Sequence, residues 1–221
     1  MKLGEIKMKK SISLVVSVLV ILTLMLSLTG CDEQKKFVGS WESTVDMTDY
    51  INQEMAKEEE LAEYLKIKEF ELVLKMTFKD DGTYKASIDE KELEKTLESA
   101  KEDFKEGMNK YFEAYIDSME LDLTVDEVLE ASGVDMDSLI EEAFGDELYS
   151  SFTDELSSEG NFKVKDGKLY LSDGLDKDIE EDVYDTYEIS ENELKLIESF
   201  GDDEEDSKEM DLYPMTFKRV D

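Results

Sequence analysis

The chain has 221 residues, with 59 Asp and Glu against 25 Lys and Arg, no His and a single Cys. The lack of His excludes a Ser-His-Asp triad, a Cys-His dyad and a His-ligated metal, and a single Cys cannot form a disulfide within the chain. The formal charge of -34 should repel nucleic acid and anionic membrane surfaces, and it favours cationic partners and divalent metals.

The N-terminal segment has the residue order of a secretory signal. The Lys-rich residues 7–10 precede an apolar run over residues 12–28, and small residues then lead to the single Cys. Basic, apolar and small residues in this order are typical of an exported chain. The last residues of the segment resemble the bacterial lipobox, which is an aliphatic residue, two small residues and Cys: Leu28, Thr29, Gly30 and Cys31.

The lipobox resemblance implies a lipid anchor. In that family the thiol carries a diacylglycerol group, and a peptidase cuts before the modified Cys. We therefore expect residues 1–30 to be a lipoprotein signal peptide and residues 31–36 a lipidated tether, with Cys31 holding an extracytoplasmic chain on the cell membrane. The alternatives are an uncleaved transmembrane helix and an ordinary signal peptide. The first thirty residues carry four Lys and one Glu, a net charge of +3, so the remaining chain carries -37.

The next segments predict strands on either side of a helix. Residues 37–47 and 70–79 alternate apolar and polar side chains, the period of a half-buried strand. Residues 48–68 carry apolar side chains at helical spacing and predict an amphipathic helix. The pair Asp81 and Gly82 predicts a tight turn, so that residues 70–79 form a hairpin with the strand that follows.

Residues 89–158 change to a helical period. Apolar side chains recur every three or four positions from Leu93 to Met119 and predict one long amphipathic helix. Its apolar stripe is more often part of a core than a groove for a partner.

Two shorter helices are predicted next. Thr124 and Glu127 have the spacing of a capping box, and Gly133 should end the helix that they begin. Apolar side chains over residues 139–152 predict a further helix. No Lys or Arg occurs between residues 111 and 162.

Strands resume near residue 161. The turn pair Asp166-Gly167 predicts a second hairpin, and residues 183–197 predict a third. A last strand is expected over residues 212–220. About eight strands joined mostly by hairpins predict an α+β fold, an up-and-down antiparallel barrel or curled sheet, in which residues 89–158 are a helical insertion.

The strand blocks resemble the lipocalins. Gly39, Ser40 and Trp41 match the Gly-x-Trp signature, in which the Trp closes one end of an eight-stranded barrel. Bacterial lipocalin-like lipoproteins are similar in this opening, in the Asp-Gly-Thr-Tyr turn at residues 81–84 and in a last strand like residues 212–218. The resemblance implies that residues 37–221 form a lipocalin-like (calycin-type) domain. The long insertion departs from plain lipocalins and could occlude or replace a barrel mouth.

Five aromatic side chains are candidates to line the barrel. They could surround a small apolar ligand or fill a packed core, and the packed core is favoured because a domain without a disulfide needs that burial. The five are Trp41, Phe70, Phe78, Tyr84 and Phe217.

An acidic cluster near the C-terminus is a candidate metal site. Carboxylates of Asp202, Asp203 and Asp206 could hold Ca²⁺ weakly, but a solvated acidic loop is the favoured interpretation. No cofactor and no catalytic residue set is predicted.

The sequence therefore favours a non-enzymatic binding module of unknown ligand on a lipocalin-like scaffold. The first alternative is an envelope protein-interaction or structural domain that acts through the acidic helical insertion. A hydrolase that uses paired carboxylates is a third hypothesis. A solid barrel core combined with an exposed apolar patch on the helices would favour the interaction role.

Overall fold

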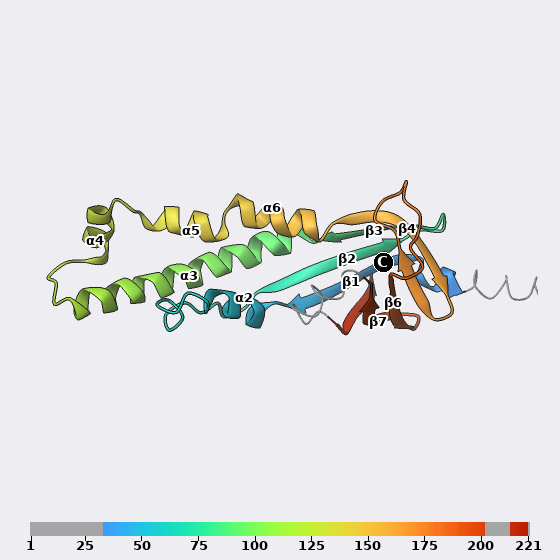
Figure 1. Cartoon of the computed structure of the whole chain (residues 1–221), viewed down its shortest axis with the longest axis horizontal. Helices are drawn as coiled ribbons and strands as arrows, with labels where there is room; N and C mark the ends of the chain where they lie inside the picture. Colours follow the sequence, from blue (N-terminus) through green and yellow to red (C-terminus); the bar gives the residue numbers. More distant parts are fainter. Residues whose placement is uncertain (1–32, 202–212, 221) are drawn as a thin grey trace, which may run out of the picture.

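The computed structural model of the chain describes residues 33–201 and 213–220. A first helical stretch covers residues 33–37, and the labelled elements in Figure 1 follow it. The strands are β1 (Gly39–Asp46), β2 (Glu71–Phe78), β3 (Thr83–Ile88), β4 (Ser158–Lys165), β5 (Lys168–Leu171), β6 (Tyr184–Ile189), β7 (Glu193–Phe200) and β8 (Met215–Val220). The helices are α2 (Thr48–Met55), α3 (Glu90–Ser118), α4 (Val125–Ser132), α5 (Met136–Phe144) and α6 (Asp146–Glu155).

The eight strands form a closed antiparallel barrel in which each strand pairs with its neighbours in the chain. β8 closes the barrel by pairing with β1, where Trp41 lies opposite Arg219. The turn between β2 and β3 forms as predicted, because Gly82 adopts a positive φ of 87° and the Asp81 carboxylate accepts a hydrogen bond from the Thr83 amide at 3.0 Å. The predicted α+β barrel with a helical insertion is confirmed.

Antiparallel order places successive connections at alternate rims of the barrel. One rim carries the helical stretch that begins at Glu33 and the short turns after β2, β4 and β6, and we call it the closed rim. The opposite rim carries the long connections that leave β1, β3 and β5, and we call it the arm rim. In Figure 1 the two rims are far apart, with the helices at the left and the first described residues at the right.

The insertion after β3 is an extended helical arm, which we define as α3 to α6. The 29 residues of α3 reach about 40 Å at about 1.5 Å per residue. The Asp89 side chain starts this helix by accepting hydrogen bonds from the Lys91 and Glu92 amides at 3.0 and 3.3 Å. α4 lies at the far end, and α5 and α6 return alongside α3 (Figure 1).

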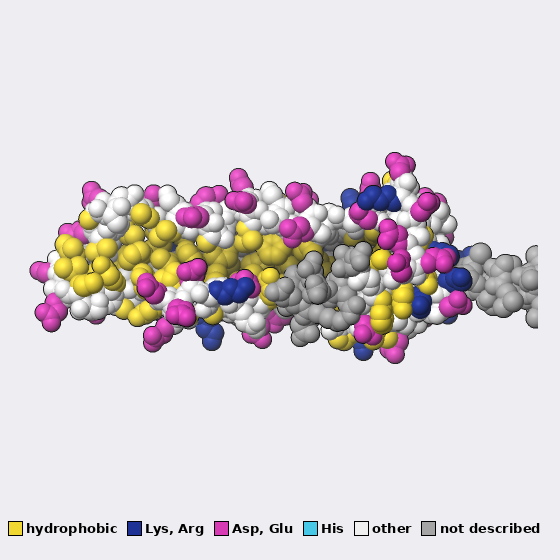
Figure 2. Space-filling view, in the orientation of Figure 1, with side chains coloured by type: hydrophobic (Ala, Val, Ile, Leu, Met, Phe, Trp, Pro, Cys, Tyr) yellow, Lys and Arg dark blue, Asp and Glu magenta, His cyan; other side chains and the backbone are white. Residues whose placement is uncertain are grey.

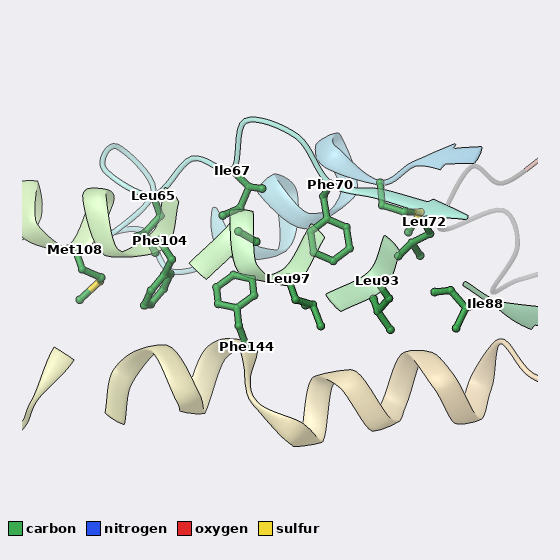
Figure 3. Packing of buried hydrophobic residues seen from close by; sticks show 12 residues of the cluster. Leu65, Ile67, Phe70, Leu72, Ile88, Leu93, Leu97, Phe104, Met108 and Phe144 are labelled. Atoms are coloured by element: carbon green, nitrogen blue, oxygen red, sulfur yellow. The ribbon is translucent and has the colours of Figure 1, made fainter. Parts of the chain in front are cut away.

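Buried side chains form two separate clusters. The barrel core lies inside the sheet, and it consists of Phe37, Trp41, Met76, Phe78, Tyr84, Phe162, Val164, Leu169, Leu194, Leu196 and Phe217. The arm core lies where α3, α5 and the segment before β2 meet the arm rim (Figure 3). It consists of Met47, Leu65, Ile67, Phe70, Leu72, Ile88, Leu93, Leu97, Ala100, Phe104, Met108 and Phe144.

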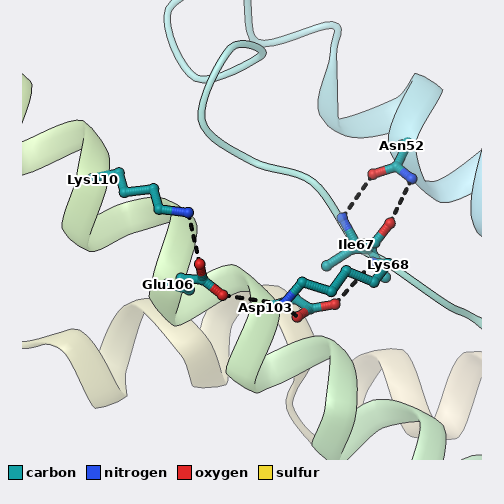
Figure 4. Close-up of polar contacts among 6 residues, drawn as sticks. All are labelled: Asn52, Ile67, Lys68, Asp103, Glu106 and Lys110. Atoms are coloured by element: carbon teal, nitrogen blue, oxygen red, sulfur yellow. Dashed lines mark hydrogen bonds and ion pairs between the residues drawn. The ribbon is translucent and has the colours of Figure 1, made fainter.

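Two predicted helices are corrected by the structure. The helix expected over residues 48–68 ends at Met55, and the chain then passes through turns to β2. The Asn52 side chain holds the later residues by accepting from the Ile67 amide at 2.8 Å and donating to the Ile67 carbonyl at 2.9 Å (Figure 4). These contacts keep Ile67 buried in a non-helical conformation.

The helix expected over residues 139–152 is two helices, α5 and α6, that meet at Gly145. Gly145 has extended backbone angles, φ -84° and ψ -161°, which end α5. A Cβ at this position would overlap the Glu141 carbonyl oxygen, so a larger residue would require the chain to move. The prediction of the long helix, of the Thr124–Glu127 capping box and of the end at Gly133 is confirmed.

Candidate functional site

Four of the five aromatic candidates lie together inside the barrel. Trp41, Phe78, Tyr84 and Phe217 belong to the barrel core, and each is at most 5% exposed. Phe70 does not belong with them, because it precedes β2 and packs in the arm core with its ring 5.7 Å from that of Phe152. Its place in an alternating pattern made it look like a strand residue, but the strand begins one residue later.

Aromatic rings fill the centre of the barrel. The ring of Phe37 lies edge-on to those of Phe78 and Tyr187, at 5.4 and 4.8 Å, and Phe78 lies 4.8 Å from Phe162. Such edge-to-face contacts at this spacing are typical of a close-packed interior. The rings around Phe37 are therefore close-packed, whereas Tyr84 also borders the cavity described below.

The closed rim is sealed around Trp41. The Trp41 indole N–H donates to the Phe37 carbonyl at 2.6 Å, and the Arg219 guanidinium lies 4.1 Å from the centre of the indole ring. Arg219 also donates to the Val38 and Lys36 carbonyls, both at 2.7 Å. These contacts bind the first described residues to the last strand, so the chain enters the barrel at a fixed position.

A cavity of about 900 Å³ lies beside the connection from β5 to β6. Its lining includes Tyr84, Val183, Tyr184, Asp185 and Tyr213. The Tyr213 hydroxyl donates to Asp185 at 3.0 Å, and the Tyr84 hydroxyl donates to a backbone carbonyl nearby at 3.1 Å. Burial raises the pKa of Tyr84, so this hydroxyl stays protonated and remains a donor. The lining thus combines tyrosine hydroxyls with apolar side chains.

The far end of the arm exposes large apolar side chains. They lie at the end of α3, in the loop before α4 and just after α4, and each is between 39% and 55% exposed. We call this set the apolar tip, and its members are Tyr115, Met119, Leu121, Leu123 and Val134. Figure 2 shows apolar side chains gathered over the far end of the arm and continuing between its helices toward the barrel.

The base of the arm carries balanced charges. Lys68 contacts Asp103 at 2.7 Å and Glu106 at 3.1 Å, and Lys110 contacts Glu106 at 2.7 Å (Figure 4). Hydrogen bonds from Lys110 and Lys68 lower the pKa of Glu106 to about 2. Asp103 also accepts from the Lys68 amide at 2.8 Å, so this group joins α3 to the segment before β2.

The chain from residue 111 to the end of α6 has no such balance of charges. Residues 111–157 contain 15 Asp and Glu and no Lys or Arg. In Figure 2 these acidic side chains stand around the apolar surface of the arm. Three carboxylates are used locally, since Asp135 caps α5, Glu127 completes the capping box of α4 and Glu141 accepts from the Asp146 amide. The rest of the carboxylates give this region an uncompensated negative field.

The predicted metal site lies outside the described residues, because Asp202, Asp203 and Asp206 fall between residues 201 and 213. Within residues 33–201 and 213–220, no group of three or more Asp, Glu or Cys side chains is placed to hold a metal ion. The lipobox residues Leu28 to Cys31 also lie outside the described part. No helix of the part that is described has the length and apolarity to cross a membrane.

The chain matches no protein-family model, no curated protein and no solved structure. The features of the molecule that bear on its function are the cavity, the apolar tip and the charges around the tip. The negative charge around the tip could be predicted from the sequence, because residues 111–162 contain no Lys or Arg. The sequence contains no signal that the apolar side chains of the tip would be exposed, because the period of Tyr115 and Met119 is also that of a buried face.

Proposed function

We propose that this protein is a lipid-anchored, extracytoplasmic, non-enzymatic protein-interaction module. In this proposal the lipocalin-like barrel is a packed scaffold, and the helical arm is the element that binds. The observation that carries the proposal is the apolar tip, a cluster of large apolar side chains left exposed on an arm that projects from a barrel with a close-packed aromatic centre. The lipid anchor rests on the lipobox resemblance of residues 28–31.

The position of Glu33 supports a particular orientation. Tyr187 donates to the Glu33 carboxylate at 2.9 Å, which attaches this residue to the closed rim of the barrel. Cys31 precedes Glu33 by two residues, a reach of about 7 Å. A lipid on Cys31 would therefore hold the closed rim near the membrane, and the arm would point away from it toward partners (Figure 1).

The anchor is tested with Cys31→Ser in the full-length protein. The substitution removes the only thiol, so we expect the protein to leave the membrane fraction and appear in soluble fractions or the medium. The matched control is Ser27→Ala, which changes the same segment and keeps Cys31. Leu26→Ser is not suitable as a control, because a polar residue in the apolar run weakens export. Retention of the Cys31→Ser protein in membranes would show that the anchor is not lipid on this residue.

The interaction role is tested by cross-linking in living cells. A photo-cross-linking amino acid replaces Met119 in the full-length anchored protein, and the matched control carries it at Glu188, an exposed position on β6. We expect a discrete covalent adduct with another protein from position 119 and none from position 188. No adduct from position 119, or the same adducts from both positions, would contradict the proposal.

The cavity supports a second candidate function, the binding of a small molecule. Its volume of about 900 Å³ lies within the range of ligand pockets, and tyrosine hydroxyls beside apolar side chains suit a ligand that is partly apolar. Native mass spectrometry of residues 31–221 with Cys31→Ser, prepared from the protein's own host, tests it. A reproducible bound mass that is lost on Val183→Trp would favour this function, and a bare mass in every preparation would count against it.

A further inference from the structure

The apolar tip is flanked by acidic residues on every segment that carries it. Tyr115 and Met119 alternate with Asp117 and Glu120 in the chain, and Asp122 lies between Leu121 and Leu123. All of these acidic residues are exposed. A partner must therefore bury apolar side chains at the centre and meet negative charge at the edge.

The charges identify the chemistry of that partner. Residues 111–137, which carry the apolar tip, contain nine carboxylates and no Lys or Arg. This charge repels acidic proteins and anionic lipid, whereas it attracts Lys and Arg side chains. A second copy of this chain would bring the same negative field to the contact, so self-association through the tip is disfavoured. The complementary surface is apolar on one side and basic around it.

We propose that the far part of the arm binds a basic amphipathic helix, a segment with an apolar stripe bordered by Lys and Arg. This inference rests on the proposed function and names the class of its partner. A helix presents apolar side chains at positions i, i+3, i+4 and i+7, which allows one face to enter the apolar surface between the helices of the arm. Its flanking cations then reach the carboxylates at the edge.

Two physical effects contribute to the binding. Burial of the exposed apolar side chains contributes a non-directional attraction that grows with the apolar area removed from water. The charges speed association and select against acidic partners, and their effect weakens as salt rises. Binding should therefore fall with added salt without vanishing, because the apolar part is not screened.

The probe is a fluorescent synthetic peptide of about 18 residues, long enough to form a helix on binding, with Leu and Lys arranged in one amphipathic pattern. Fluorescence anisotropy measures its binding to residues 31–221 with Cys31→Ser at about 0.15 M salt. A peptide with the same composition in a scrambled order has no apolar stripe. A third peptide has Glu in place of every Lys.

We expect the amphipathic basic peptide to bind at least about tenfold more tightly than either control peptide. The combination Met119→Ser, Leu121→Ser and Leu123→Ser should weaken its binding about tenfold or more, because exposed residues at the centre of a contact contribute most. These residues are exposed in the free protein, so the substitutions leave no cavity. Circular dichroism on the same samples checks that the helices remain.

A charge-reversal pair separates the tip from the overall charge of the protein. Asp117→Lys with Asp122→Lys changes the edge of the tip, and Glu188→Lys with Glu198→Lys makes the same change in net charge on exposed barrel positions. Asp117 lies at the C-terminal end of α3, where a cation such as the introduced Lys stabilises the helix. A loss of binding in this variant therefore does not result from unfolding of α3. We expect about a tenfold loss from the first pair and less than about twofold from the second.

Equal binding of the ordered and scrambled peptides, equal effects of the two charge pairs, or no binding of the basic peptide would overturn this inference. So would a sedimentation velocity result in which the protein alone self-associates and the tip substitutions abolish it, since the occupant would then be a second copy. If position 119 still gives an adduct in cells while the peptide does not bind, only the basic-helix inference fails. If position 119 gives no adduct in cells, the proposed function itself fails.

Discussion

The barrel and the arm bury their apolar side chains in different ways. In the barrel, each strand has two neighbours, and the aromatic side chains are buried inside the closed sheet. The arm packs α5 and α6 along one side of α3, and beyond the arm core it leaves large apolar side chains on the surface. The barrel is therefore the part with the closed aromatic core, and the arm is the part with a cluster of exposed apolar side chains at its tip.

The largest effect is expected from Trp41→Ala in the barrel. Trp41 is fully buried, and the change removes its packing, its hydrogen bond to Phe37 and the ring beneath Arg219. We expect a loss of about 4 kcal/mol in the free energy of unfolding, measured by urea denaturation. Trp41→Phe, which keeps an aromatic ring, should lose less than half as much. A loss below about 1 kcal/mol would show that the closed rim is not essential to the barrel.

A matched change in the arm is Phe144→Ala. Phe144 is buried in the arm core, with its ring 5.4 Å from that of Phe104 (Figure 3). We expect a loss of about 3 kcal/mol that is confined to the arm. Hydrogen exchange should become faster in α5 and α6 and stay unchanged in β1 to β8. Equal acceleration in both parts would mean that barrel and arm unfold as one unit, and the comparison would fail.

A smaller effect is expected where the two parts meet, from Asp103→Asn. Asp103 is largely buried and accepts from both the Lys68 amide and the Lys68 ammonium. The Asn side chain can accept only one of these bonds and turns its amide group toward the other donor. We expect a loss of about 1 to 2 kcal/mol in thermal or urea unfolding. The control is Lys68→Met, which keeps the amide bond to Asp103 and should cost less; a larger loss than that of Asp103→Asn would contradict this account.

The smallest effect concerns pH. The folded pKa of Glu106 is lowered to about 2 from an ordinary value of 4.5 by Lys110 and Lys68. A lowered pKa means that the carboxylate contributes stability above about pH 4.5 and that this contribution is lost as the pH falls through about 2. Carboxyl chemical shifts in an NMR titration measure the pKa directly.

Lys110→Met is the variant that tests this assignment. It should raise the pKa of Glu106 toward its ordinary value, and Lys68→Met should do so less because its contribution is second. Because Glu106 is exposed, the effect on overall stability should be small and should weaken with salt. An unchanged pKa in both variants would show that the two lysines do not hold the carboxylate.

Local patterns predicted the barrel. The alternating residues of β2 and the turn pairs Asp81-Gly82 and Asp166-Gly167 act over a few positions, so they are visible in the sequence. The helix predicted over residues 48–68 was wrong because its second half is held by contacts with Asn52 and with Asp103, which is 35 residues away from Lys68. Contacts at that separation leave no periodic trace.

The charge of the candidate site could be predicted from the sequence, but the exposure of its apolar side chains could not. The lack of Lys and Arg between residues 111 and 162 is a property of composition, so it can be read directly from the sequence. Exposure of Met119 and Leu121 depends on where α3 ends and on how α4 turns back, which no helical period specifies. Phe70 shows the same limit, since its alternating position suggested the barrel while tertiary packing placed it beneath the arm.

The arm leaves and re-enters the barrel at neighbouring positions, since Ala86 of β3 pairs directly with Ser158 of β4. In terms of topology, the whole insertion is therefore one long loop of the hairpin between β3 and β4. The entropic cost of closing this loop rises only slowly with its length. A connection of this kind can be exchanged without a change in the pairing of β3 with β4. In evolution or in the laboratory, the same barrel could carry arms of different length and charge, each presenting its own surface.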